Sequence, residues 1–145
     1  MIYLRTYRSG SRQNERKTLT KAVRLGDLAS RIANPNVRGA VAKFTYHPPV
    51  HLWDFGVRAS ERLEGGDVVY ILCEDTLYYS KIFEKIEDPN GEIGDLVEWH
   101  RIQQAPWKNP MVLKPLVALD SLAPAVHTLA TKRIEENFFQ LQPSS

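Results

Sequence analysis

Two apolar runs of strand length, separated by only three residues, constrain the fold more than any other feature of the sequence. The first run covers residues 68–73, and the second, rich in Tyr, Ile and Phe, covers residues 77–86. Parallel strands need a crossover of roughly a dozen residues or more, whereas antiparallel strands need only a tight turn. The linker Glu74-Asp75-Thr76 therefore predicts an antiparallel hairpin and a sheet whose central strands are joined by turns.

Turn-forming residues lie on both sides of this hairpin. Asp88-Pro89-Asn90-Gly91 combines a proline, which presets one backbone angle, with an Asn-Gly pair that admits positive φ. Gly65-Gly66 precedes the first run, and we expect at least one of these glycines to adopt a positive φ. The two sites predict sharp changes of chain direction before and after the hairpin.

Hydrophobic periodicity in the rest of the chain predicts further strands and two helices. The expected strands are residues 1–7, 37–46, 51–57, 96–102 and 111–119, with Pro115 forcing an edge position or a bulge in the last. The expected helices run from Leu19 to Asn34-Pro35 and from a Ser121 cap through Phe138 to Leu141, and residues 57–66 are expected to form a polar connection. This order predicts an α+β fold, a small, partly open β-barrel of about six strands flanked by a helix in the N-terminal half and a C-terminal helix.

Length and composition favour one domain over residues 1–145, with a basic N-terminal arm and the start of a linker near residues 142–145. No apolar run approaches the roughly 20 residues of a membrane-spanning helix, and the first residues lack the features of a secretory signal. The single cysteine, Cys73, has no partner for a disulfide. We therefore expect a soluble, cytoplasmic protein without membrane partners.

Charge is distributed unevenly, although the net charge is only +2. Residues 1–43 carry ten Lys or Arg against two acids, and a Gly-Ser stretch at residues 9–11 is typical of a loop. A basic segment of this kind suits a polyanion, and its phosphate contacts carry no sequence information. The candidate phosphate-binding residues are Arg8, Arg12, Arg16, Lys17, Arg58 and Lys108. The alternative is a solvated basic surface without a ligand.

The patterns of several enzyme classes are missing from the sequence. The histidines His47, His51, His100 and His127, together with one cysteine, do not form a zinc-binding pattern. Gly65-Gly66-Asp67 precedes a strand, whereas the phosphate-binding glycine loop called the P-loop precedes a helix. We expect no catalytic residues, no metal and no cofactor.

Several aromatic and glycine-containing segments occur in an order that resembles a known superfamily. Trp53 and Phe55 come first, then Gly65-Gly66-Asp67 leading into the run at residues 68–72, then Tyr79-Ser80-Lys81-Ile82, with Trp99 and Trp107 downstream. Over roughly residues 37–120 this order resembles the PUA-like superfamily, particularly its EVE and YTH branches. It is also similar to the N-terminal recognition domains of McrB-type modification-dependent restriction systems.

The resemblance implies a barrel that reads RNA or DNA, often by holding a flipped methylated base in an aromatic cage. Trp53 matches the cage tryptophan, and Trp99 or Trp107 would form the opposite wall. An acid such as Asp54 can accept a hydrogen bond from an exocyclic amine, and Phe55 and Tyr46 complete the candidate cage. The YTH branch has small hydroxyl residues where this chain has Asp54-Phe55. Each of these aromatic side chains has the alternative role of core packing.

Two functions follow from these patterns. The first is a non-catalytic targeting module of a restriction system that recognises a modified or flipped base, with DNA favoured over RNA. Its motor domain and nuclease would lie on other segments or subunits. The alternative is a PUA-like RNA-binding or protein-interaction module that uses only the basic arm.

Overall fold

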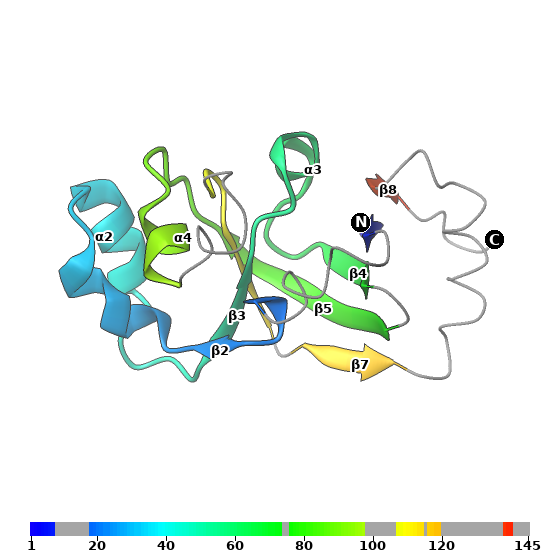
Figure 1. Cartoon of the computed structure of the whole chain (residues 1–145), viewed down its shortest axis with the longest axis horizontal. Helices are drawn as coiled ribbons and strands as arrows, with labels where there is room; N and C mark the ends of the chain where they lie inside the picture. Colours follow the sequence, from blue (N-terminus) through cyan, green and yellow to red (C-terminus); the bar gives the residue numbers. More distant parts are fainter. Residues whose placement is uncertain (8–17, 74–75, 98–106, 115, 120–137, 141–145) are drawn as a thin grey trace.

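The structure is a computed structural model and describes residues 1–7, 18–73, 76–97, 107–114, 116–119 and 138–140 (Figure 1). The sheet has the strand order β2-β3-β6-β5-β4-β1-β8, and β7 pairs with β5 beside this path. Its strands are β1 (Ile2–Tyr7), β2 (Ala22–Val23), β3 (Val50–Trp53), β4 (Val68–Cys73), β5 (Thr76–Lys85), β6 (Met111–Leu113), β7 (Val117–Leu119) and β8 (Phe138–Gln140). Among the described residues the end strands β2 and β8 do not pair with each other, so the sheet is open, and the expected α+β fold with an unclosed sheet is confirmed.

The predicted hairpin is the centre of this sheet. β4 and β5 pair antiparallel in continuous register from Val68 opposite Lys81 to Cys73 opposite Thr76. β1 pairs with the other edge of β4 in parallel, from Ile2 beside Val68 to Tyr7 beside Cys73. A parallel pair needs a long crossover, and the intervening chain supplies β2, β3 and helical segments between the two strands.

Helical segments lie mainly at one end of the molecule. They are the 3-10 helix η1 (Leu25–Arg31) and the α-helices α2 (Pro35–Ala42), α3 (Val57–Arg62) and α4 (Glu92–Leu96). Figure 1 shows α2 and α4 together at the left, α3 above the sheet, and β8 with the N-terminus at the opposite end. The short helices lie between strands of a mostly antiparallel sheet, so the chain is of the α+β class and has no regular series of parallel βαβ units.

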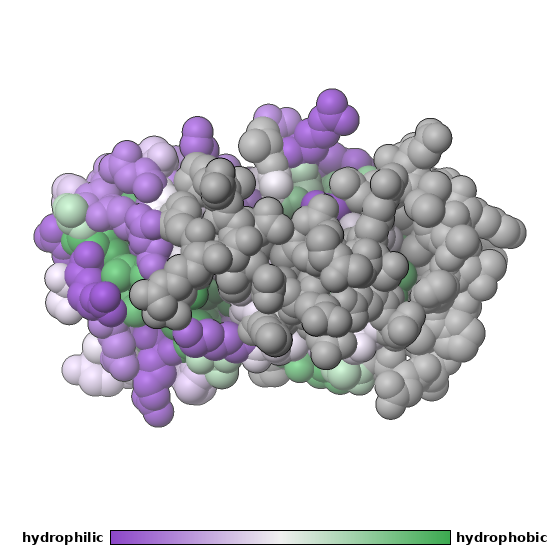
Figure 2. All heavy atoms as spheres, viewed as in Figure 1, coloured by the Kyte–Doolittle hydropathy of each residue, from purple (hydrophilic) through white to green (hydrophobic). Residues whose placement is uncertain are grey.

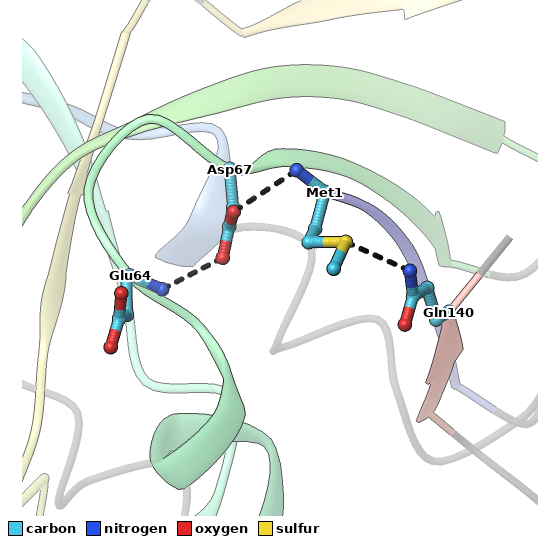
Figure 3. A network of polar contacts seen from close by, with 4 residues as sticks. All are labelled: Met1, Glu64, Asp67 and Gln140. Atoms are coloured by element: carbon cyan, nitrogen blue, oxygen red, sulfur yellow. Dashed lines mark hydrogen bonds and ion pairs between the residues drawn. The ribbon is translucent and has the colours of Figure 1, made fainter.

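The turn before β4 is fixed by Gly66 and Asp67. Gly66 has a φ of +96°, which confirms the positive φ expected at the glycine pair. One oxygen of Asp67 accepts the Glu64 backbone N–H at 2.9 Å, and the other lies 3.3 Å from the Met1 ammonium nitrogen (Figure 3). Gln140 Nε2 donates to Met1 Sδ at 2.9 Å. These contacts join the beginnings of β1 and β4 to β8.

Both faces of β4 carry buried side chains. Val69, Ile71 and Cys73 point to the main core, where they belong to one cluster with Trp53 and Trp107. Side chains alternate along a strand, so Leu72 and its partner Leu77 point to the opposite face, and both are buried there. Continuous burial explains why residues 68–73 read as an unbroken apolar run.

The helix expected over residues 19–33 is wrong. This segment forms the short strand β2 and then the 3-10 helix η1. A Cβ at Gly26 would overlap the backbone Cα of Thr45. Packing against the neighbouring backbone, which periodicity does not report, therefore decides the path of this segment.

The strand expected over residues 37–46 is also wrong, because α2 occupies most of it. The Asn34 side chain accepts the backbone N–H groups of Asn36 and Val37, and Pro35 occupies the first turn. Proline is favoured there because its missing N–H has no helical partner. The dipeptide Asn34-Pro35, expected to end a helix, begins one.

The remaining boundaries also differ from expectation. β3 ends at Trp53, and α3 lies within the expected polar connection. Leu96 ends helix α4, and residues 98–102 of the expected strand lie outside the described residues. The expected strand over residues 111–119 consists of two strands, β6 and β7. Phe138 lies in strand β8 and not in a helix, while Ser121 and Leu141 lie outside the described residues.

The turn at residues 88–91 is confirmed, and it introduces a buried carboxylate. Gly91 N–H donates to the Asp88 carbonyl at 3.0 Å, and Gly91 has a φ of +68°. The buried Asp88 carboxylate accepts the backbone N–H groups of Glu92 at 3.2 Å and Ile93 at 2.8 Å. Burial raises the pKa of Asp88 above its ordinary value of 3.8, although these two hydrogen bonds oppose the shift.

We expect Gly26→Ala to lower the free energy of unfolding by about 2 kcal/mol or more, because the new methyl group overlaps Thr45 backbone. Gly39→Ala is the matched control. Gly39 lies in α2, and a Cβ added there would meet no neighbour within 4 Å, so alanine should stabilise the helix by about 0.5–1 kcal/mol. Urea unfolding measures both changes, and equal stability of the two variants would contradict the close approach at Gly26.

Asp88→Asn tests the buried carboxylate. Because its pKa is raised, the folded protein binds the Asp88 proton more tightly than the unfolded chain does. The Asp88 contribution to stability is therefore greatest below pH 3.8 and falls as the pH rises through the raised pKa. The stability of the wild type minus that of Asp88→Asn should decrease over this range in urea titrations. A difference that grows with pH would contradict the assignment.

Candidate nucleic-acid interface

Two of the three candidate cage tryptophans lie against each other in the core. Trp53 ends β3, and its ring meets that of Trp107 edge to face, with 6.1 Å between the ring centroids and 72° between the planes. Trp53 is 1% exposed and Trp107 is 2% exposed. Phe55 is equally buried. The rings of Trp53, Trp107 and Phe55 are closed to solvent in this conformation, and Trp99 lies outside the described residues.

Asp54 connects the end of β3 to the segment that carries Trp107. One carboxylate oxygen accepts Gly56 N–H at 2.8 Å, and the other accepts Asn109 N–H at 3.0 Å. Gly56 has a φ of +95°, which lets the chain turn directly from β3 into α3. An ionised carboxylate has further lone pairs beside these two bonds, so it can still accept a hydrogen bond from a ligand.

Helix α4 packs directly against Trp107. A Cβ at Gly94 would lie 3.1 Å from Trp107 Cβ and 3.2 Å from its Cγ. Asp88 binds the first turn of α4 and also donates its backbone N–H to the Lys108 carbonyl at 2.8 Å. Asp88, Gly94 and Asn109 therefore hold Trp107 in place, and sequence reasoning missed all three. The turn motif at residues 88–91 was the available signal, because its first residue caps the next helix.

Tyr46 does not join the tryptophan pair. Its side chain is 99% exposed, on the turn between α2 and β3. The alternative role of core packing is therefore wrong for Tyr46, whereas it describes where Trp53, Phe55 and Trp107 lie.

A second aromatic cluster lies beside this turn. The rings of Phe44, His47 and Phe83 meet edge to face, with centroid distances of 5.4, 5.5 and 5.6 Å. Phe83 is 45% exposed, and Lys114 Nζ lies 5.9 Å from its ring centroid. The sequence pattern predicted a strand over residues 77–86 but did not single out Phe83.

The structure describes two of the six candidate phosphate-binding residues. Arg58 on α3 and Lys108 beside Trp107 are both exposed. Arg8, Arg12, Arg16 and Lys17 lie outside the described residues. Arg62 also belongs to α3, and its guanidinium lies 5.4 Å from the Tyr3 ring centroid and 5.3 Å from that of Phe138. Figure 2 shows hydrophilic side chains gathered around α3 and over the end of the molecule that carries α2.

Neither a metal-binding cluster nor a membrane-spanning helix occurs in the described residues. They contain no group of three His, Cys, Asp or Glu side chains placed to hold a metal ion. No helix within the described ranges is long and apolar enough to cross a membrane.

Comparison with known proteins identifies the fold. No family model matches the sequence, and no curated protein matches it. The structure is similar to the N-terminal domain of Thermococcus gammatolerans McrB, solved bound to m5C DNA, with a TM-score of 0.57 and 14% sequence identity. The similarity covers 90% of this chain and 81% of the McrB chain. The chain therefore has the fold of a McrB N-terminal domain, as its resemblance to that group implied.

Proposed function

We propose that this chain is a non-catalytic DNA-binding domain that recognises a modified, methylated or flipped base as the targeting module of a restriction system. The observation that carries the proposal is the likeness, over 90% of the chain, to a McrB domain that was solved with m5C DNA. The paired tryptophans and the uneven basic charge of the chain support it. A motor domain and a nuclease on other segments or subunits complete the proposed system.

The proposed base site is the region of Trp53 and Trp107, with Asp54 at its edge and Trp99 and Phe55 as further walls. A base leaves its helix at a loss of a few kcal/mol, and stacking on an aromatic ring returns about 1–3 kcal/mol per base. Because both rings are buried, the base enters only if the Trp53–Trp107 pair separates. The Asp54 bonds to Gly56 and Asn109 join the two sides that must move apart.

The proposed phosphate contacts come from two parts of the chain. Lys108 directly follows Trp107, and Arg58 lies on α3 shortly after Trp53. Arg8, Arg12, Arg16 and Lys17 form a basic arm that adds sequence-independent affinity.

One observation favours the alternative, an RNA-binding or protein-interaction module that uses the basic arm alone. The Trp53 and Trp107 rings are closed to solvent, as they are in a core without a ligand. The main proposal predicts that methylation of the DNA raises affinity, and the alternative predicts that it does not.

Titration with matched duplexes, one carrying m5C and one unmodified, tests the main proposal. One buried methyl group is worth about 0.8 kcal/mol, so we expect a preference of about fourfold or more for the methylated duplex. Tryptophan emission should change with the methylated duplex because the paired rings separate. Equal affinity for both duplexes would overturn modified-base recognition and favour the alternative.

Trp107→Phe tests the proposed base site. The substitution removes part of one wall of the proposed base site. The ratio of the affinity for the methylated duplex to that for the unmodified duplex should therefore fall toward one. Ile71→Val is the matched control, because Ile71 is a fully buried core residue on β4 and its truncation lowers stability without altering the tryptophan pair. The ratio is independent of the folded fraction. An unchanged ratio in Trp107→Phe would remove Trp107 from the site.

Replacing Arg8, Arg12, Arg16 and Lys17 by alanine tests the basic arm. Affinity for methylated and unmodified DNA should fall by the same factor. The slope of log affinity against log salt should become shallower by about 0.9 for each lost phosphate contact. Arg31→Ala removes an exposed charge from η1 and is the control for net charge. An unchanged slope in the fourfold variant would show that the arm does not contact phosphate.

A further inference from the structure

We propose that the turn after α2 and the neighbouring part of β5 form a second, solvent-exposed stacking surface for an unpaired DNA base. This Tyr46–Phe83 surface consists of Lys43, Phe44, Tyr46, His47, Phe83 and Lys114. The inference rests on the proposed DNA-binding function and adds a contact outside the Trp53–Trp107 region.

The exposure of the two aromatic side chains is the first observation. Tyr46 is 99% exposed and Phe83 is 45% exposed, and the other large apolar residues exposed in the described part of the chain are the aliphatic Met1, Ile2 and Val117. Core packing therefore does not explain Tyr46. An exposed aromatic face can stack on any base, because every base has a π-face.

The turn that carries Tyr46 is held firmly. Thr45 N–H donates to the Ala42 carbonyl at 3.1 Å, its hydroxyl donates to the same carbonyl at 2.6 Å, and His47 N–H donates to the Phe44 carbonyl at 3.0 Å. Gly26 packs against the Thr45 backbone from the other side. A preorganised turn loses little conformational entropy on binding, so ordering the backbone around Tyr46 takes little from the binding free energy.

Phe83 lies on the exposed side of β5, next to the buried Ile82, at the position of a β-bulge. Ile82 pairs with Leu113 and Glu84 with Val112, so Phe83 is the extra residue on β5. The Gly65-Gly66 turn packs on this bulge, since Gly66 N–H donates to the Ile82 carbonyl at 2.7 Å and a Cβ at Gly65 would lie 3.0 Å from the Phe83 carbonyl oxygen. Bulges commonly redirect one side chain beside a functional site. Phe83 is 45% exposed at this bulge, and its ring meets those of Phe44 and His47 edge to face.

The charge around the two rings suits a nucleic acid strand. Lys114 Nζ lies 5.9 Å from the Phe83 ring centroid. The Lys114 backbone N–H donates to the carbonyl of Lys81, whose side chain is also exposed. Lys43 Nζ lies 3.5 Å from Glu84 Oε1. Three exposed lysines thus lie on these elements, and one of them, Lys43, is paired with the partly buried Glu84. Cations interleaved with exposed aromatic rings are typical of surfaces that bind single strands.

Affinity for a fluorescently labelled single-stranded oligonucleotide tests the proposal. Tyr46→Ala should weaken binding about tenfold without changing the salt slope, because stacking and not phosphate contact is lost. Tyr46→Phe should bind like the wild type. Lys114→Gln should weaken binding and make the salt slope shallower by about 0.7, the value for one phosphate contact to a single strand. Val117→Ala, which shortens a side chain on β7 that is about as exposed as Phe83, is the control and should leave affinity unchanged.

Photocrosslinking of the wild-type protein supplies a second readout, which does not depend on whether a variant folds. An oligonucleotide carrying 5-iodouracil crosslinks efficiently to a ring stacked on the base, so mapped crosslinks at Tyr46 or Phe83 support the proposal. Crosslinks only at other residues, with normal binding by Tyr46→Ala, overturn it. So does a change of oligomeric state in Tyr46→Ala with unaltered DNA affinity, which would make the surface a contact between copies.

The two proposals fail in different ways. Binding of methylated duplex by the wild type, without an effect of Tyr46→Ala or Phe83→Leu on single-stranded binding, overturns the Tyr46–Phe83 surface alone. If the wild-type protein binds neither methylated duplex nor single strands, the proposed function fails and the surface fails with it.

Discussion

The candidate base site depends on the buried Asp88 carboxylate. Asp88 accepts two backbone N–H groups of α4 and donates its own backbone N–H to Lys108. The helix and the segment carrying Trp107 are therefore positioned by one residue. Gly94 then lets α4 approach the Trp107 ring closely, and Trp107 meets Trp53 at the end of β3. Burial that raises the pKa of Asp88 also strengthens its hydrogen bonds, because water does not compete for them.

The aromatic side chains fall into two groups with different physical roles. Trp53 and Trp107 are closed to water and belong to the main core, so any ligand must displace packed side chains to reach them. Tyr46 and Phe83 are exposed on a hydrogen-bonded turn and a β-bulge, so a ligand reaches them without rearrangement. In the proposed function the first group provides selectivity and the second adds affinity for an unpaired strand.

Local rules predicted the parts of the fold that local chemistry decides. The short linker at residues 74–76 predicted the β4–β5 hairpin, and the glycine pair predicted the positive φ found at Gly66. The same kind of reasoning was wrong at Asn34-Pro35, where one dipeptide is compatible with a helix end or a helix start. It was also wrong around Gly26, whose conformation follows from contact with Thr45.

The sequence by itself determined the hairpin, its flanking turns and the α+β class, because turn chemistry and short linkers act between neighbouring residues. It also identified Trp53 and Trp107 as candidates for one site, and the structure brings them together. Only the tertiary structure decided which aromatic side chains are exposed, since exposure depends on what distant segments pack against. The parallel pairing of β1 with β4 and the bulge at Phe83 were likewise decided there, because backbone pairing between distant strands leaves little trace in local sequence.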